Sequence, residues 1–156
     1  MQTVTEQGRT ANEQAVFEAI AVKPETPANE LLETMTDALH THFKHYSGVY
    51  IYMVEGDLLV LHHYRGRPTE HVRIPVGEGV CGRAVRIKET VTVDDVTADP
   101  DYIMCSLETR SEIVVPILRG DIALGEIDID SDIPGAFNQQ DQLFLEELAR
   151  RVQARL

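Results

Sequence analysis

The chain has 156 residues, of which 43% are hydrophobic and 26% are charged, the proportions of an ordinary globular protein. Its formal net charge of −12 argues against nucleic acid and anionic membranes as partners, since both require basic surfaces. No apolar run approaches the ~20 residues of a transmembrane helix, and residues 1–10 lack the hydrophobic stretch of a signal peptide. We therefore expect a single cytoplasmic domain over residues 1–156, with residues 1–10 flexible and both cysteines reduced.

The first half of the chain predicts two helices followed by a hairpin. Apolar residues recur every three or four positions between Ala28 and His45, which is the spacing of an amphipathic helix. A shorter helix is expected before it, over Asn12–Ala21, and ends before Pro24. The hairpin is expected to consist of Gly48–Val54, the turn Glu55-Gly56-Asp57 and Leu58–Tyr64.

The second half predicts further strands around one helix and a final helix. The expected elements are a strand over His71–Val76, a helix over Val80–Ile87, a short strand over Thr90–Val93, and a hairpin of Glu112–Leu118 and Ile122–Asp130 that turns at Arg119-Gly120-Asp121. The irregular acidic stretch Asp94–Arg110 exceeds normal loop length, and such loops are usually functional or mobile. Asn138 and Asp141 have the spacing of a capping box at the start of the last helix. Hairpins between terminal helices predict an α+β fold, an antiparallel sheet with the N- and C-terminal helices packed on one face.

The strand that ends at Asp130 carries its acidic residues on one side. Side chains alternate along a strand, so Glu126, Asp128 and Asp130 share one face and the isoleucines between them share the other. Carboxylates spaced ~7 Å apart destabilise a strand unless the face is wet or meets a cation. A solvated sheet face is one interpretation. Glu112 opens the neighbouring strand, and four acids on two paired strands favour a site for an ammonium group or a metal ion.

The two cysteines, Cys81 and Cys105, lie on segments next to these acids. Negative neighbours disfavour a thiolate, so the acids should have another task, such as holding a cation or supplying a proton. Cys81 follows Gly77-Glu78-Gly79 at a helix start, where the helix N-terminus would lower its pKa. The alternative for either cysteine is a structural role, because free cysteine is among the most buried residue types.

Two further sequence patterns are weaker indications of function. Residues 77–82 match the dinucleotide pattern G-x-G-x-x-G, but Glu78 would face the pyrophosphate and the chain lacks alternating βαβ units. No Cys/His spacing matches a structural zinc site, so we expect exposed histidines and no resident metal ion. A mixed metal site of His71, the two cysteines and the acids stays open as an alternative.

Several of these motifs, in this order, resemble the free methionine-R-sulfoxide reductases, which are single GAF domains. The resemblance rests on Val72-Arg73-Ile74-Pro75-Val76-Gly77, Gly79-Val80-Cys81-Gly82, the loop with Cys105, Ser111 to Pro116, and Asp128-Ile129-Asp130-Ser131. It implies a GAF fold and the thiol-dependent reduction of free L-methionine-R-sulfoxide to methionine. A GAF module that senses a small ligand in the same pocket is the alternative, although a sensor has no need for this set of thiol and acids.

The resemblance also implies a role for individual residues. It identifies Cys105 as the thiol that attacks the substrate sulfur, and Cys81 as a second redox cysteine close by. It makes Glu112, Asp128 and Asp130 the substrate-binding carboxylates. The two aspartates would hold the substrate's ammonium group, and Glu112, kept neutral by burial, would protonate the sulfoxide oxygen.

The chain departs from the family at His71, which stands ten residues before Cys81, where the usual resolving cysteine is found. Either Cys81 resolves with Cys105, or a small external thiol does so, or the site no longer turns over. His71 could instead raise the thiolate fraction of a nearby cysteine as an imidazolium, or be an ordinary strand residue on a polar face.

The remaining expectations concern partners. The resemblance implies no bound cofactor, free methionine sulfoxide as substrate, and thioredoxin or another thiol as reductant. The chain contains no tryptophan, which family members often carry near the substrate. The apolar stripes of the first and last helices could form a homodimer seam or could pack on their own sheet.

Overall fold

The computed structural model describes residues 10–103 and 106–156. Its elements, in chain order, are α1 (Ala11–Ile20), α2 (Ala28–His42), β1 (Gly48–Glu55), β2 (Leu58–Gly66), β3 (Arg73–Pro75), α3 (Gly79–Ile87), β4 (Val91–Val93), the short 3₁₀ helix η2 (Val96–Ala98), β5 (Ser111–Arg119), β6 (Ile122–Ser131) and α4 (Gln139–Gln153). Every helix and strand expected from the sequence is present. The capping box of α4 is also confirmed, with Asn138 and Asp141 each accepting from the other's backbone N–H.

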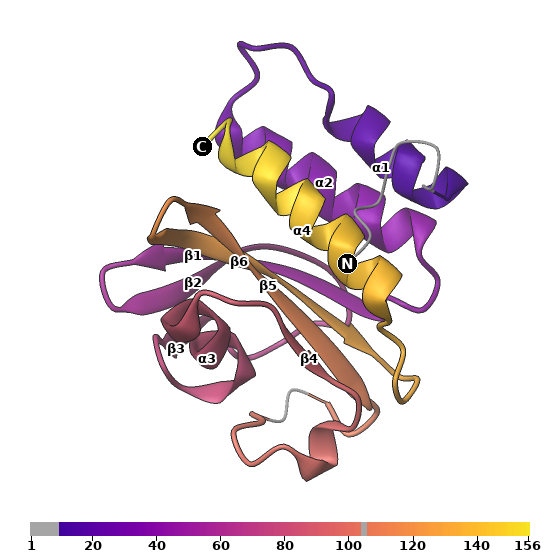
Figure 1. Ribbon diagram of the computed structural model, residues 1–156, viewed down its shortest axis with the longest axis vertical. Helices are drawn as coiled ribbons and strands as arrows, with labels where there is room; N and C mark the ends of the chain where they lie inside the picture. The colour runs from indigo at the N-terminus through magenta and orange to yellow at the C-terminus, as the bar shows by residue number, and fades with distance from the viewer. Residues whose placement is uncertain (1–9, 104–105) are drawn as a thin grey trace.

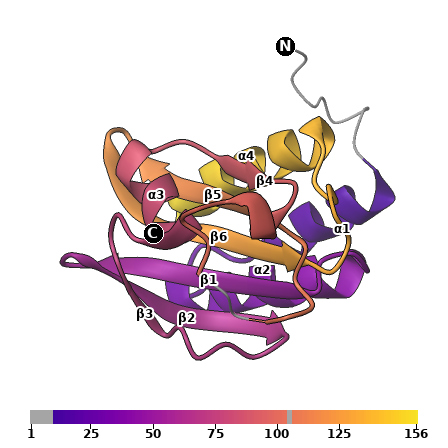
Figure 2. The same cartoon turned by 90° about the horizontal axis from the view of Figure 1, so that it is seen from below.

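In the described part of the chain, six strands form one sheet in the order β3-β2-β1-β6-β5-β4, with every neighbouring pair antiparallel. Helices α1, α2 and α4 cover one face (Figure 1). Helix α3 lies on the opposite face, together with the 94–103 segment, as the view from below also shows (Figure 2). The predicted α+β fold with terminal helices on one face is therefore confirmed.

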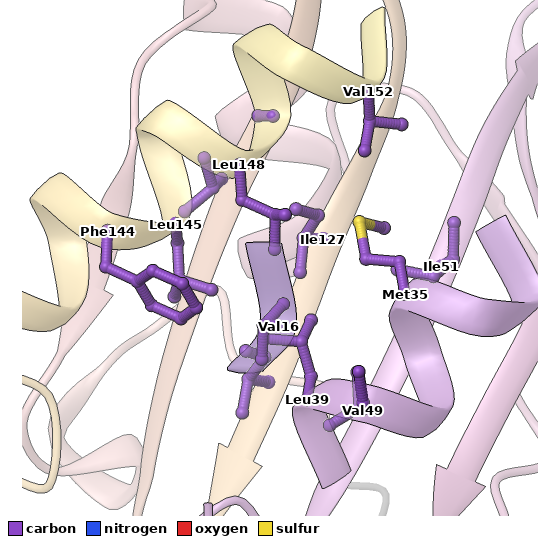
Figure 3. Close-up of a cluster of buried hydrophobic side chains, with 14 of the residues drawn as sticks. Val16, Met35, Leu39, Val49, Ile51, Ile127, Phe144, Leu145, Leu148 and Val152 are labelled. Carbon is purple, nitrogen blue, oxygen red and sulfur yellow. The ribbon is translucent and has the colours of Figure 1, made fainter. Parts of the chain in front are cut away.

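The main core lies between these three helices and the sheet (Figure 3). Met35 and Leu39 from α2 and Leu148 from α4 are fully buried against strand residues such as Ile51 and Ile127. These positions recur every three or four residues in the helices and every second residue in the strands, which is why one face of each element is apolar.

Several predicted boundaries differ from the observed ones, and side-chain contacts lie at two of them. Helix α2 ends at His42 rather than at His45, since Phe43 takes an extended conformation (φ −123°, ψ 100°). In that conformation the Phe43 ring stacks on Tyr46 at 4.6 Å and on Phe144 of α4 at 5.3 Å between centroids. No local pattern reveals the contact with α4.

The second boundary concerns the strand expected from His71, which is confined to Arg73–Pro75. His71 precedes it, and its carbonyl accepts a 2.7 Å hydrogen bond from the Tyr52 hydroxyl. This bond holds the residue beside β1 without making it a strand residue.

No helix in residues 10–103 and 106–156 combines the length and the apolar character needed to cross a membrane.

Candidate active site

Four carboxylates gather on the face of the sheet that α3 covers. Register places Glu112 of β5 opposite Asp130 of β6, and Val114 opposite Asp128. Glu126 follows on the same face, opposite Tyr52 of β1. All four acids are buried, with exposed fractions of 5% for Glu112, 0% for Glu126, 5% for Asp128 and 4% for Asp130. The interpretation as a solvated sheet face is therefore excluded.

Cys81 joins this cluster from the first turn of α3. Its thiol is buried and donates a 3.1 Å hydrogen bond to Oδ2 of Asp128. Helix α3 packs across β5 and β6, which brings its first turn over the acidic positions of both strands. The sequence therefore correctly places one cysteine beside the acids.

The expectation that the helix N-terminus lowers the pKa of Cys81 is wrong. Burial raises the pKa of the Cys81 thiol well above its usual value, and the charges of Asp128, Glu126 and Glu112 raise it further. A helix N-terminus contributes only a partial positive charge, which desolvation and three acids outweigh. Cys81 is therefore held as a protonated thiol in the resting protein.

The pKa values of the four acids are raised for the same reason. Burial raises the pKa of Glu112 well above its usual value, with the charge of Asp128 adding to it, which confirms the raised value expected for this residue. Burial likewise raises the pKa values of Asp128 and Asp130, to which Asp130 and Glu112 respectively add. Burial is also the main cause of the raised pKa of Glu126, with the Cys81 thiol acting in the opposite direction.

Several carboxylate oxygens in this cluster have no hydrogen-bond partner among the described residues. They are Oδ1 of Asp128, Oδ1 of Asp130 and both oxygens of Glu126. Unpartnered buried acceptors are rare in folded proteins because each costs about 1–3 kcal/mol. The cluster is thus built to accept hydrogen bonds from a donor, and a cationic donor would also offset its negative charge.

A small cavity opens onto the cluster. Its volume is about 20 Å³, and it is lined by Tyr52, His71, Ile74, Gly79, Val80, Cys81, Ile103, Glu112 and Asp128. This is room for roughly one water-sized group. The structure thus brings Cys81, Glu112, Asp128 and His71 together around one cavity, whereas Asp130 lies one step further along β6 and does not line it.

The acidic connection after β4 closes one side of this cavity. Arg83 of α3 makes ion pairs with Asp99 at 2.9 Å and with Asp101 at 2.7 Å. Ile103 then packs on Gly79, where an added Cβ would lie 2.7 Å from Ile103 Cδ1. Gly79 also has a φ of +67°, so both space and backbone conformation require glycine there.

Sequence reasoning missed Arg83, although a cation two positions after Cys81 and a following run of aspartates is the signal that could have indicated it. The predicted attacking thiol, Cys105, lies outside the described residues, and its role stays a prediction.

A profile of the GAF domain matches residues 25–154. The chain belongs to the GAF domain family. It is 37% identical over 102 residues to the free methionine-R-sulfoxide reductase of Escherichia coli, covering 65% of this chain and 61% of that protein. It is 41% identical over 109 residues to the free methionine-R-sulfoxide reductase of Saccharomyces cerevisiae, covering 69% and 60%. Both matches thus span less than two thirds of the relative's length.

Among solved structures, the free methionine-R-sulfoxide reductase of Neisseria meningitidis in complex with its substrate superposes with a TM-score of 0.84 and 35% identity. That match covers 92% of this chain and 84% of the other. The chain is therefore homologous to free methionine-R-sulfoxide reductases over most of its length.

Proposed function

We propose that this protein reduces free L-methionine-R-sulfoxide to methionine through a cysteine sulfenic acid and a disulfide. The observation that carries the proposal is the buried cluster of Glu112, Asp128, Asp130 and the Cys81 thiol, whose unpartnered oxygens call for a cationic ligand. The homology to free methionine-R-sulfoxide reductases supports the choice of substrate.

Asp128 and Asp130 bind the α-ammonium group of the substrate. Each has one buried oxygen that no described residue contacts by a hydrogen bond, and an ammonium group brings three N–H donors and one positive charge. Charge-assisted hydrogen bonds of this kind are stronger than neutral ones. A peptide-bound methionine sulfoxide lacks the ammonium group, which accounts for a preference for the free amino acid.

Glu112 donates a proton to the sulfoxide oxygen. It lines the cavity and is 5% exposed, and burial with the charge of Asp128 raises its pKa so that it keeps its proton. A neutral carboxylic acid can hydrogen-bond the S–O oxygen and protonate it as the bond breaks.

The redox step belongs to the thiols. Cys105 attacks the substrate sulfur, and the protonated oxygen leaves as water when the S–O bond breaks. Water then attacks the Cys105 sulfur and breaks its bond to the substrate sulfur, so methionine leaves with two more electrons and Cys105 becomes a sulfenic acid. Cys81 then attacks that sulfenic acid, forming a disulfide and releasing water. Thioredoxin or another dithiol returns both cysteines to the thiol state.

The buried, protonated state of Cys81 suits a resolving rather than an attacking thiol. Its pKa is raised and its proton is directed at Asp128, so it is a poor nucleophile before the substrate has reacted. His71 lines the same cavity in place of the usual resolving cysteine, which leaves Cys81 as the second thiol of the cycle.

Substrate entry requires the cavity to widen. A volume of about 20 Å³ cannot contain a free amino acid. The segment that closes the cavity is attached through the two ion pairs of Arg83 and through Ile103. The two ion pairs are partly exposed, so we expect them to separate when substrate enters.

A coupled assay with both methionine sulfoxide diastereomers, each free and N-acetylated, tests the proposal. We expect turnover of the free R form alone. The preference for the R form follows from the homology, and the N-acetylated compounds should not react because they lack the ammonium group that the two aspartates bind. Equal activity on the N-acetylated compound would contradict the binding assignment. Cys105→Ala should release no methionine, and full activity in that variant would overturn the reductase assignment.

The resolving role of Cys81 is tested by a single turnover without reductant. The wild type should lose both free thiols together, whereas Cys81→Ala should stop at a sulfenic acid that dimedone traps. The geometry demands that the two Cα atoms come within ~7 Å. Mass spectrometry that finds both thiols free after methionine has formed would rule this role out.

A further inference from the structure

The donors around the small cavity also have the spacing of a metal site. Cys81 Sγ, one oxygen of Glu112 and one oxygen of Asp128 all lie within 4.8 Å of one another. The pair formed by Cys81 Sγ and Asp128 Oδ2 is separated by only 3.1 Å. Zinc binds thiolate at ~2.3 Å and carboxylate at ~2.0–2.2 Å in a tetrahedron, which puts neighbouring donors about 3.5 Å apart.

The size of the cavity and the unpartnered Oδ1 of Asp128 both favour an occupant of the size of a single ion. All three donors line a space of about 20 Å³, which is the volume of roughly one water-sized group. Asp128 is 5% exposed, lines that space, and keeps Oδ1 without a partner among the described residues. A divalent cation placed there would offset the charge of acids that now face one another.

We propose that Cys81, Glu112 and Asp128 form a reversible binding site for a thiophilic divalent cation, of which Zn²⁺ is the representative. On binding, the Cys81 thiol and any protonated carboxylic acid release their protons to solvent, and no redox change occurs. Mg²⁺ and Ca²⁺ fit poorly, because they require six or more oxygen ligands and retain their water, whereas the cavity is small and one donor is sulfur.

The consequence for the protein is inhibition, and this part alone rests on the proposed function. A bound cation would neutralise Asp128, which the substrate ammonium needs, and would hold Cys81 as a metal ligand, which prevents it from forming a disulfide. Zn²⁺ should therefore compete with methionine sulfoxide, and a chelator should restore turnover.

Binding is tested on the reduced full-length chain with Co²⁺ as a spectroscopic probe and Zn²⁺ as a competitor. We expect one Co²⁺ per chain, a thiolate-to-cobalt charge-transfer band, and loss of the band on adding Zn²⁺ but not Mg²⁺. Cys81→Ser should lose the band. Asp128→Asn and Glu112→Gln should bind Co²⁺ at least about tenfold more weakly, because even changes to groups that only support a metal ligand cost about 10–100-fold in affinity.

Two matched controls separate this site from binding elsewhere on an acidic chain. Glu126→Gln makes the same isosteric change on the same strand face but does not line the cavity, so it should keep the band and the affinity. Cys105→Ser should keep the band as well. An unchanged band in Cys81→Ser, its loss in Cys105→Ser alone, or equal weakening by Glu126→Gln and Asp128→Asn would each overturn the proposal.

The outcome is also separable from that of the proposed function. Co²⁺ binding with the expected variant pattern, in a protein whose metal-free form reduces no methionine sulfoxide, would leave the metal site standing and refute the reductase. Reductase activity in a protein that shows no charge-transfer band would do the reverse.

Discussion

The two faces of β6 are equally enclosed but carry opposite chemistry. Ile127 and Ile129 are fully buried against the helical layer of α1, α2 and α4. Glu126, Asp128 and Asp130 alternate with them and are 0–5% exposed beneath α3. Burial therefore does not distinguish a structural face from a functional one. The difference lies in whether each buried group has found its partner.

The two faces of β6 affect the free energy of unfolding in opposite directions. An enclosed isoleucine contributes about 1.5–3 kcal/mol to the free energy of unfolding. A buried acid without a hydrogen-bond partner costs about 1–3 kcal/mol. The acidic face therefore lowers the free energy of unfolding, and the helical face supplies the stability that offsets this cost.

Among the four acids of the cluster, Glu112, the proposed proton donor, should affect activity most when it is replaced. Glu112→Gln should lower kcat by about 10²–10⁴-fold with a small change in KM, since general acid catalysis contributes that much and the amide cannot give up a proton. Steady-state kinetics with free methionine-R-sulfoxide measure this. Glu126→Gln is the matched control, and an equal loss in both variants would show that the face as a whole, not Glu112, is required.

Truncation on the helical face should affect stability instead. Ile127→Ala removes a fully buried side chain next to Asp128 and should lower the free energy of unfolding by about 2–5 kcal/mol. Urea titration measures the loss, and Ile127→Val should cost only about 0.5–1.5 kcal/mol. The kcat of the folded fraction should stay near that of the wild type. A large fall in kcat without loss of stability would contradict the assignment of stability to the helical face and activity to the acidic face.

Removing the charge of either aspartate should weaken substrate binding. Asp128→Asn and Asp130→Asn should each raise KM about 10–150-fold, the equivalent of the ~1.5–3 kcal/mol of a charged hydrogen bond. Their free energies of unfolding should not fall, since neither loses an apolar contact. An unchanged KM with a reduced kcat in both variants would mean that the aspartates act in the chemical step and not in substrate binding.

The arrangement of the acids could be predicted from the sequence because it depends on local geometry. A period of two puts Glu126, Asp128 and Asp130 on one face, and hairpin register brings Glu112 to Asp130. The capping box of α4 is local in the same way. Spacing alone is enough in each of these cases.

The sequence could not predict which distant segments pack around the acids and Cys81. The burial of the acids depends on α3 and on Ile103 packing over them, and the protonation of Cys81 follows from that burial rather than from its helix. The end of α2 depends on the ring of Phe144, a hundred residues away. Contacts between distant segments set these features, and no local pattern records them.

Replacing Glu126, a buried acid whose oxygens have no partner among the described residues, by glutamine should raise the free energy of unfolding by an amount that grows with pH. The pKa of Glu126 is raised in the folded state, so folding takes up a proton once the unfolded side chain ionises, and stability falls as pH rises. Glu126→Gln removes this dependence. The variant should match the wild type near pH 4 and gain up to about 1.4 kcal/mol per pH unit above the unfolded pKa of about 4.3. Urea titrations at several pH values test this, and parallel curves would contradict it.

Asp141 should make stability depend on pH in the opposite direction from Glu126, and by a smaller amount, because it is a buried acid whose oxygens have hydrogen-bond partners. Its oxygens accept hydrogen bonds from the Tyr46 hydroxyl at 2.8 Å and the Asn138 backbone N–H at 3.0 Å. Burial alone would raise the pKa of Asp141, but His45 and these two donors lower it below its usual value.

The lowered pKa means that the wild type holds fewer protons folded than unfolded, so its stability falls as pH falls. Asp141→Asn loses the charge and, because an amide has only one oxygen, one of the two accepted hydrogen bonds, and should cost about 1 kcal/mol at pH 7. That difference should be complete above the unfolded pKa of about 3.9 and should shrink as pH drops toward 3. A wild-type advantage that stayed constant from pH 7 to pH 3 would mean that the carboxylate charge at Asp141 contributes nothing.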